Sequence, residues 1–149
     1  MLRLELQDVS GAGGVPDEAQ FQRWLARCFD DRPGQTVLVR VVAPDESRRL
    51  NRDYRGKDRP TNVLSFPFEV PAEIPSDHLG DLVICAEVVA GEAAAQGKAP
   101  LDHWAHMLIH GVLHLLGYDH VEPDEAEVME ALETRLLARL GIADPYRIE

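Results

Sequence analysis

Residues 106–120 read HMLIHGVLHLLGYDH and hold four of the six histidines in this 149-residue chain. Apolar residues recur here at the spacing of one helix face, which predicts a helix over residues 99–116 with that face in the core. The face comprises Leu101, Ala105, Leu108, Ile109, Val112, Leu115 and Leu116. On the same helical wheel the histidines fall on the opposite side, within roughly 80° of one another. They are His103, His106, His110 and His114.

The spacing of these histidines predicts a metal site that needs one ligand from outside the helix. His110 and His114 are about 6 Å apart along the helix axis, so both imidazoles can reach one ion at Zn–N distances of about 2 Å. A third histidine eight positions away on a straight helix would be roughly 12 Å distant. Gly117 stands where helices commonly end in a left-handed residue, so the chain can turn back and bring His120 to the pair. A histidine-bearing surface without metal is the simpler alternative, and His103 and His106 are expected to be bystanders.

Three neutral imidazoles leave a divalent ion with an open position for water, which is typical of a catalytic metal site. In HExxH zinc peptidases a glutamate base follows the first histidine, whereas this chain has Gly111. Two interpretations of Gly111 stay open: room for a substrate beside the metal, or close packing against a strand. A fourth ligand, such as His78 or an acidic side chain, would instead close the coordination sphere and make the metal structural.

Patterning along the rest of the chain predicts an α+β fold. Alternating or β-branched segments indicate strands at residues 2–9, 36–43, 62–66 and 80–87. Helices are expected from Pro16-Asp17-Glu18 onward and at 46–55 (with Asp45 as N-cap), 88–97, 99–116 and 123–140. The order βαβαββααα favours a small mixed four-stranded sheet packed with about five or six helices, with the metal cleft at the helix that bears HxxxH. We expect one domain over residues 1–149.

The charge of the chain is strongly negative but segregated. A formal net charge of −11 argues against a protein that coats nucleic acid through bulk attraction. However, six of the fifteen lysines and arginines lie within twelve positions: Arg48, Arg49, Arg52, Arg55, Lys57 and Arg59. Guanidinium groups hold phosphates bidentately and Tyr54 is available to stack on a base, so this run is a candidate RNA surface. A solvated helix with Asp53 and Asp58 as local partners is the alternative.

The remaining composition bears on redox state and location. Cys28 and Cys85 are far apart and form no CxxC pair, so both are expected to be reduced core residues. The start of the sequence lacks a basic segment followed by an apolar run, and no apolar stretch approaches the roughly 20 residues of a membrane span. We therefore expect a cytoplasmic protein with no membrane partner.

Three segments resemble the hallmark motifs of one protein family. HGVLHLLGYDH is similar to the signature HGxLHLxGYDH of the YbeY family, the bacterial endoribonucleases and rRNA maturation factors. LNRDYRGKDRPTNVLSFPFE and GDLVICAE resemble the second and third hallmarks of that family. The resemblance covers most of the chain from about Leu50 to His120.

The resemblance implies a zinc-dependent, single-strand-specific endoribonuclease that acts in 3′ end maturation of 16S rRNA and in ribosome quality control. It implies one Zn²⁺ per chain on His110, His114 and His120, and a functionally important arginine at Arg55. The implied partners are single-stranded RNA, the small ribosomal subunit and assembly factors such as a GTPase, while the oligomeric state stays open. One departure is Asn62, where members of the family often carry aspartate.

The mechanistic hypothesis rests on a histidine triad with no adjacent carboxylate. Zinc would polarise the scissile phosphate or supply hydroxide, and Arg55 would stabilise the developing charge. Asp119 is expected to orient a ligand through a hydrogen bond, and no general acid or base is assigned. Two alternatives stay open: a metallohydrolase of another substrate class, such as a peptidase, and a non-catalytic ribosome-assembly factor stabilised by zinc.

Overall fold

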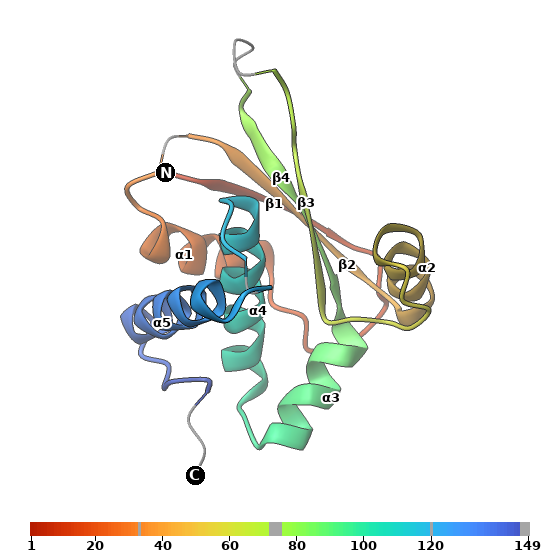
Figure 1. Ribbon diagram of the computed structural model, residues 1–149. Helices are drawn as coiled ribbons and strands as arrows, with labels where there is room; N and C mark the ends of the chain where they lie inside the picture. The colour runs from red at the N-terminus through yellow and green to blue at the C-terminus, as the bar shows by residue number, and fades with distance from the viewer. Residues whose placement is uncertain (33, 72–75, 120, 147–149) are drawn as a thin grey trace.

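The computed structural model describes residues 1–32, 34–71, 76–119 and 121–146. Its elements follow the predicted order along the chain (Figure 1). The strands are β1 (Arg3–Asp8), β2 (Thr36–Val42), β3 (Val63–Pro67) and β4 (His78–Cys85). The helices are α1 (Glu18–Cys28), α2 (Pro44–Arg55), α3 (Ala86–Gln96), α4 (Pro100–Leu115) and α5 (Pro123–Arg139). Five helices and a four-stranded sheet among the described residues confirm the α+β prediction.

The sheet is mixed, with the strand order β1-β2-β4-β3. β1, β2 and β4 run parallel, and β3 pairs antiparallel with β4, from Val63 opposite Ile84 to Pro67 opposite Gly80. β2 is rich in β-branched residues and lies between two neighbours, as expected for a strand buried on both faces. β3 is short and lies at an edge, beside α4.

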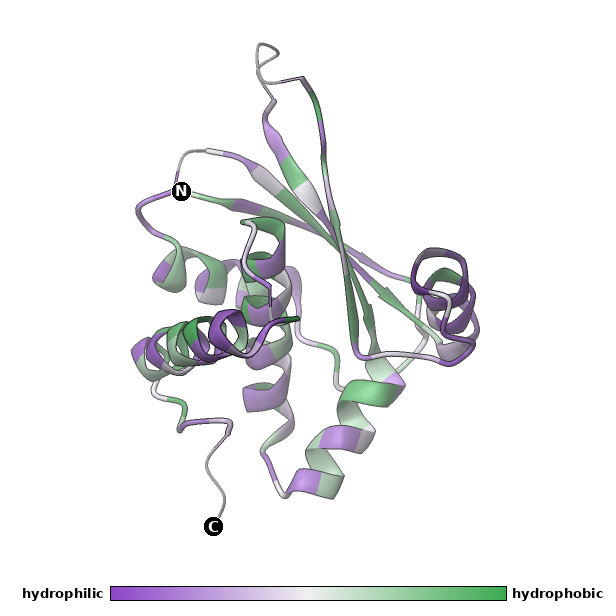
Figure 2. Cartoon of the chain, in the orientation of Figure 1, coloured by the Kyte–Doolittle hydropathy of each residue, from purple (hydrophilic) through white to green (hydrophobic). Residues whose placement is uncertain are grey.

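Helices cover the two faces of the sheet unequally. α1 and α4 pack on one face, over the larger core, with α5 packed against these two helices, and α2 lies on the other face (Figure 1). The second face holds a smaller cluster of Val42, Leu64, Val83 and Cys85, against which Leu50 of α2 packs. α2 is otherwise mostly hydrophilic, whereas the strands are largely hydrophobic (Figure 2). The basic run on α2 is therefore placed on the surface of the molecule.

α4 is buried on nearly all sides, because it packs against α1, α3, α5 and the sheet. Eleven of its sixteen residues are buried. These include His103 and His106, at 3% and 7% exposure, so the side of the helix opposite the predicted apolar face is also covered. The prediction was wrong for Leu101, which is 52% exposed, because it lies in the first turn of the helix.

Two helix ends can be compared with the predictions. The α1 prediction is confirmed, since the Asp17 carboxylate caps the helix by accepting from the Gln20 N–H at 2.8 Å. Asp45 as N-cap of α2 was wrong: the N-cap is Ala43, and Pro44 takes the first helical position. Proline suits that position because its φ is already helical and no N–H is lost there. Asp45 lies in the first turn, where its charge complements the helix dipole.

The end of α4 turns at glycine, as predicted. Gly117 has a φ of 101°, and the Tyr118 N–H donates to the Leu113 carbonyl at 3.0 Å. This turn directs the chain away from the helix axis immediately after His114. His120 lies outside the described residues.

Both cysteines are buried and free, as predicted. Burial raises the pKa of Cys28 to about 11, which suppresses its reactive thiolate. Among the described residues, no helix combines the length and the apolar character needed to cross a membrane.

Gly111 is explained by packing against the sheet. A Cβ at this position would lie 2.8 Å from Leu82 Cδ2 and 3.3 Å from Val63 Cγ2. Of the two interpretations of this glycine, the contact with the strands is thus confirmed, and it allows α4 to approach β3 and β4 closely.

We predict opposite effects for two glycine-to-alanine changes. Gly111→Ala should lower the free energy of unfolding by about 1 kcal/mol, because overpacking, typically about 1–3 kcal/mol, exceeds a helix-propensity gain of about 1 kcal/mol. Gly91→Ala is the matched control in α3, where a Cβ meets nothing within 4 Å, and should raise stability by about 0.5–1 kcal/mol. Urea unfolding measures both. Equal stabilisation by the two changes would contradict the close contact.

Candidate metal and substrate cleft

A cleft of about 980 Å³ lies between β3 and α4. Its walls come from the end of α2 and the following loop, from β3, from α3 and α4, and from the segment after α5. Arg55 and Lys57 line it together with His110 and His114. The basic run and the histidine stretch, which are about fifty residues apart in the sequence, thus contribute to one cavity.

His110 and His114 face one another through corresponding ring nitrogens. Their Nε2 atoms are 3.2 Å apart and their ring centroids 4.7 Å apart. Both side chains are half-buried and both line the cleft. This is the one-turn pairing that the sequence predicts.

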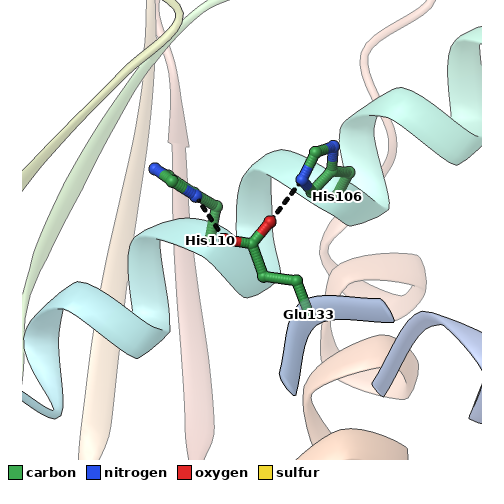
Figure 3. Close-up of side chains that lie close together, drawn as sticks. All are labelled: His106, His110 and Glu133. Atoms are coloured by element: carbon green, nitrogen blue, oxygen red, sulfur yellow. Dashed lines mark hydrogen bonds and ion pairs between the residues drawn. The ribbon is translucent and has the colours of Figure 1, made fainter. Parts of the chain in front are cut away.

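A buried carboxylate lies behind this pair. Glu133 of α5 is 0% exposed, and its Oε1 is 2.8 Å from His110 Nδ1. Its Oε2 is 2.5 Å from His106 Nε2 and accepts from the Tyr146 hydroxyl at 2.6 Å. Figure 3 shows the carboxylate reaching from α5 to both rings, with the second ring nitrogen of His110 pointing away from it.

The hydrogen bonds determine the charge of Glu133. Burial favours the neutral acid, but hydrogen bonds from His106, His110 and Tyr146 hold the pKa of Glu133 at about 2, below its ordinary value. An ionised carboxylate only accepts hydrogen bonds, so His110 must carry its proton on Nδ1. The Nε2 of a neutral His110 therefore has a lone pair, directed toward His114. Burial and the neighbouring carboxylate raise the pKa of Tyr146, which keeps its hydroxyl a donor.

His106, His110 and Glu133 could hold a metal ion, because each offers a ligand atom and these atoms all lie within 4.8 Å of one another. Imidazole and carboxylate groups suit several divalent transition metals. The donor set therefore fits a metal cofactor without identifying the metal.

The structure divides the predicted RNA-contacting residues into two groups. Arg55, Tyr54 and Lys57 line the cleft, as does Asp119. The other four lie outside the cleft lining formed by the described residues: Arg48, Arg49, Arg52 and Arg59.

Two of the four outlying arginines have acidic partners. Arg48 binds Asp58 through Nε and Nη2, at 2.7 and 3.0 Å, and Arg52 Nε lies 3.3 Å from Asp53. The solvated-helix alternative therefore describes these two residues well.

Asn62 occupies a defined place in the cleft wall. Its side-chain amide lies 3.2 and 3.3 Å from the two carboxylate oxygens of Glu92, and Glu92 Oε1 is 2.9 Å from His103 Nε2. An asparagine donates to Glu92, whereas an ionised aspartate would repel it. Burial lowers the pKa of His103, against the opposing effect of Glu92. Asparagine at position 62, where members of the family often carry aspartate, is thus compatible with the neighbouring Glu92 carboxylate.

Some predictions concerning the site were wrong or incomplete. The expectation of no adjacent carboxylate is contradicted by Glu133, and His106 is a partner of that carboxylate. His78 was suggested as a fourth ligand. Its Nε2 lies 2.6 Å from Asp81 Oδ1, and the residue is outside the cleft lining of the described residues.

A signal for Glu133 exists in the sequence: it shares the apolar stripe of α5 with Met129, Leu136 and Leu137. We find no comparable signal for Tyr146.

The fold and the site define an α+β protein with a histidine–glutamate cluster suited to a metal ion, in a cleft that also carries cations. The family model described as Endoribonuclease YbeY matches residues 15–141. This chain therefore belongs to the endoribonuclease YbeY family, which confirms the resemblance in the sequence.

Individual relatives agree with this assignment. The chain is 57% identical to the endoribonuclease YbeY of Halorhodospira halophila, over 98% of this chain and 97% of the relative. It is 58% identical to that of Alkalilimnicola ehrlichii, over 99% of this chain and 93% of the relative. The solution structure of a Thermotoga maritima protein has a TM-score of 0.65 at 25% identity, covering 99% of this chain and 100% of that one.

We predict that Glu133→Gln lowers the free energy of unfolding by about 2–4 kcal/mol. The amide NH₂ would meet a donor, and the buried hydrogen bonds would lose their charged acceptor. Glu130→Gln on the exposed side of the same helix is the control and should change stability by less than about 0.5 kcal/mol. Chemical denaturation compares the two. Similar values for both variants would contradict an ionised, hydrogen-bonded Glu133.

Proposed function

We propose that this chain is a zinc-dependent endoribonuclease specific for single-stranded RNA, in one domain over residues 1–149. The observation that carries the proposal is the shared cleft, in which Arg55 and Lys57 line the same cavity as His110 and His114. A phosphodiester cleft requires cations for the backbone and a centre that activates the scissile phosphate. The names of the relatives support the same activity.

We propose that the metal binds at the Nε2 atoms of His110 and His114, with His120 as the third ligand. Two nitrogens at about 2 Å from one tetrahedral ion are about 3.3 Å apart, and the observed separation is 3.2 Å. The alternative set with Glu133 is less suited to catalysis, because that carboxylate is fully buried and already accepts three hydrogen bonds. Glu133 is better placed to fix the orientation of His110, as carboxylates commonly do beside metal-bound histidines.

In this proposal, each residue of the cleft has its own role toward the substrate. One Zn²⁺, when bound, would supply Lewis-acid polarisation of the phosphate or an acidified water. Arg55 would hold the phosphoryl oxygens and stabilise their developing charge, and Lys57 would hold a neighbouring phosphate. Tyr54, which is 68% exposed beside Phe66, offers a face on which a base can stack. Asp119 would orient a ligand through a hydrogen bond.

We further propose that the substrate is rRNA, with a role in 3′ end maturation of 16S rRNA and in ribosome quality control. The small ribosomal subunit and an assembly GTPase would be the partners, in the cytoplasm. A net charge of −11 opposes tight binding to naked RNA. Guidance by a ribosomal partner is consistent with that charge.

Comparison of Arg55→Ala with His114→Ala tests the catalytic assignment. Arg55→Ala should lower kcat/KM for single-stranded RNA by about 100-fold while zinc content is retained. His114→Ala should lose both zinc and cleavage. Arg48→Ala, which removes a guanidinium already paired with Asp58, is the control and should change kcat/KM by no more than a few-fold. Full cleavage and full zinc content in His114→Ala would refute the proposal.

Metal removal separates catalysis from the two alternatives. Chelation should abolish RNA cleavage without unfolding the protein, so the circular dichroism spectrum should keep the signal of the folded state. Added Zn²⁺ should restore activity. A protein that unfolds on chelation, with a holoprotein that cleaves no RNA, would indicate a structural metal in an assembly factor. Cleavage of casein in preference to single-stranded RNA would indicate a peptidase.

A further inference from the structure

The cleft runs along the edge of β3. All five residues of the strand, Val63 to Pro67, line it. Successive side chains of a strand point to opposite faces of the sheet, so a cavity that touches every residue must follow the strand edge. β3 is the last strand in the order, and β4 pairs with its other edge.

The register shows which main-chain groups face the cleft. The Asn62 carbonyl accepts from the Cys85 N–H at 3.0 Å, and the Phe68 N–H donates to the Leu79 carbonyl at 3.1 Å. Between these two pairs the antiparallel register is unbroken, so hydrogen-bonded pairs alternate with pairs directed outward. The main-chain groups of Val63, Ser65 and Pro67 are therefore directed away from β4.

Few of the outward groups are donors. The Val63 N–H donates to the side-chain oxygen of Asn62 at 2.7 Å, and proline has no N–H. The edge thus presents the carbonyls of Val63, Ser65 and Pro67, and the N–H of Ser65. The Ser65 hydroxyl donates to the Gly111 carbonyl at 3.1 Å, which holds this strand beside the residue that follows His110.

An edge with more acceptors than donors suits bases better than phosphates. Phosphate oxygens are acceptors and would be repelled by the three carbonyls, whereas Arg55 and Lys57 in the same cleft attract them. Each of the four RNA bases carries a donor next to an acceptor on its Watson–Crick edge. The N–H and C=O of Ser65 form the complementary pair.

We propose that the open edge of β3 at Ser65 binds the Watson–Crick edge of an unpaired nucleotide, and that this contact selects single-stranded RNA. The inference rests on the proposed endoribonuclease function and explains its strand selectivity. In a duplex the same base edge is already hydrogen-bonded to its partner, so it cannot bind the strand. Because every base offers the required pair of groups, the contact is independent of sequence.

An extended peptide is the competing occupant, since peptides also add to open strand edges. A full ladder needs an N–H at every second residue, and this edge keeps only that of Ser65. The cations in the cleft favour a polyanion as well. These observations favour RNA.

The test uses zinc-loaded protein and short unstructured RNAs that carry one modified uridine at successive positions. N3-methyluridine blocks the Watson–Crick edge, and 5-methyluridine is the matched control with that edge intact. At one position near the cleavage site, N3-methyluridine should lower kcat/KM about tenfold relative to 5-methyluridine. Binding of the same RNAs, followed by fluorescence anisotropy, should show the same preference.

Changes at Ser65 connect this preference to the strand. Replacing the amide that precedes Ser65 by an ester removes the N–H and keeps the carbonyl and the hydroxyl. The 5-methyluridine RNA then loses the hydrogen bond to its base carbonyl oxygen, so the discrimination between the two RNAs should become smaller. Ser65→Ala keeps the N–H and removes the hydroxyl, and the discrimination should persist.

Two outcomes would overturn the inference. One is equal cleavage and binding of the two RNAs at every position by the wild-type protein. The other is displacement of RNA by an extended valine–threonine peptide without any effect of N3-methylation. A protein that binds the RNAs with the expected preference but cleaves none would refute the endoribonuclease function and leave the strand contact supported.

Discussion

The arrangement of the cleft depends on one buried negative charge. A carboxylate with no exposed surface is stable only if donors replace its lost hydration. Glu133 receives them from His106, His110 and Tyr146. The requirement connects α4, α5 and the segment after α5, and it determines which nitrogen of His110 carries the proton. The lone pair on the cleft-facing nitrogen of a neutral His110 is thus a consequence of how the charge of Glu133, on another helix, is satisfied.

The position of the β3 wall of the cleft relative to α4 depends on the absence of a side chain at Gly111. Gly111 lets α4 approach Leu82 and Val63, and the Ser65 hydroxyl then reaches the Gly111 carbonyl. Close packing at this point brings the histidine pair and the open edge of β3 to the same cavity. A larger residue would move the helix outward and separate these two walls. The packing of α4 against the sheet therefore also determines the shape of the cleft.

Local patterns in the sequence predicted the elements, their order and the pairing of His110 with His114, because these depend on neighbours along the chain. Glu133 was missed because its place in the apolar stripe of α5 indicates burial but does not reveal the donors on α4 and after α5 that stabilise a buried carboxylate. Periodicity places His103 and His106 on one side of α4, but it does not say that α3 and α5 cover that side. Arg48 and Arg52 likewise belong to a basic run, yet Asp58 and Asp53 pair with them. Contacts between distant segments decide the cases of Glu133, His103 and His106, whereas Arg48 and Arg52 pair with acids nearby in the sequence.

The charges that line the cleft also bear on which substrates it can bind. Glu92 lines the cleft on α3, while Arg55 and Lys57 line it from the end of α2 and the loop beyond. A chain of net charge −11 repels a polyanion at a distance. At physiological salt this repulsion is screened beyond about 8 Å, so the nearby charges, including Arg55 and Lys57, have the larger effect on a phosphate in the cleft. In the proposed function, such a surface would disfavour non-specific RNA binding and would bind a strand where its phosphates contact these cations. Asn62, as a neutral donor to Glu92, keeps a second negative charge from adding to the acidic side of the cleft.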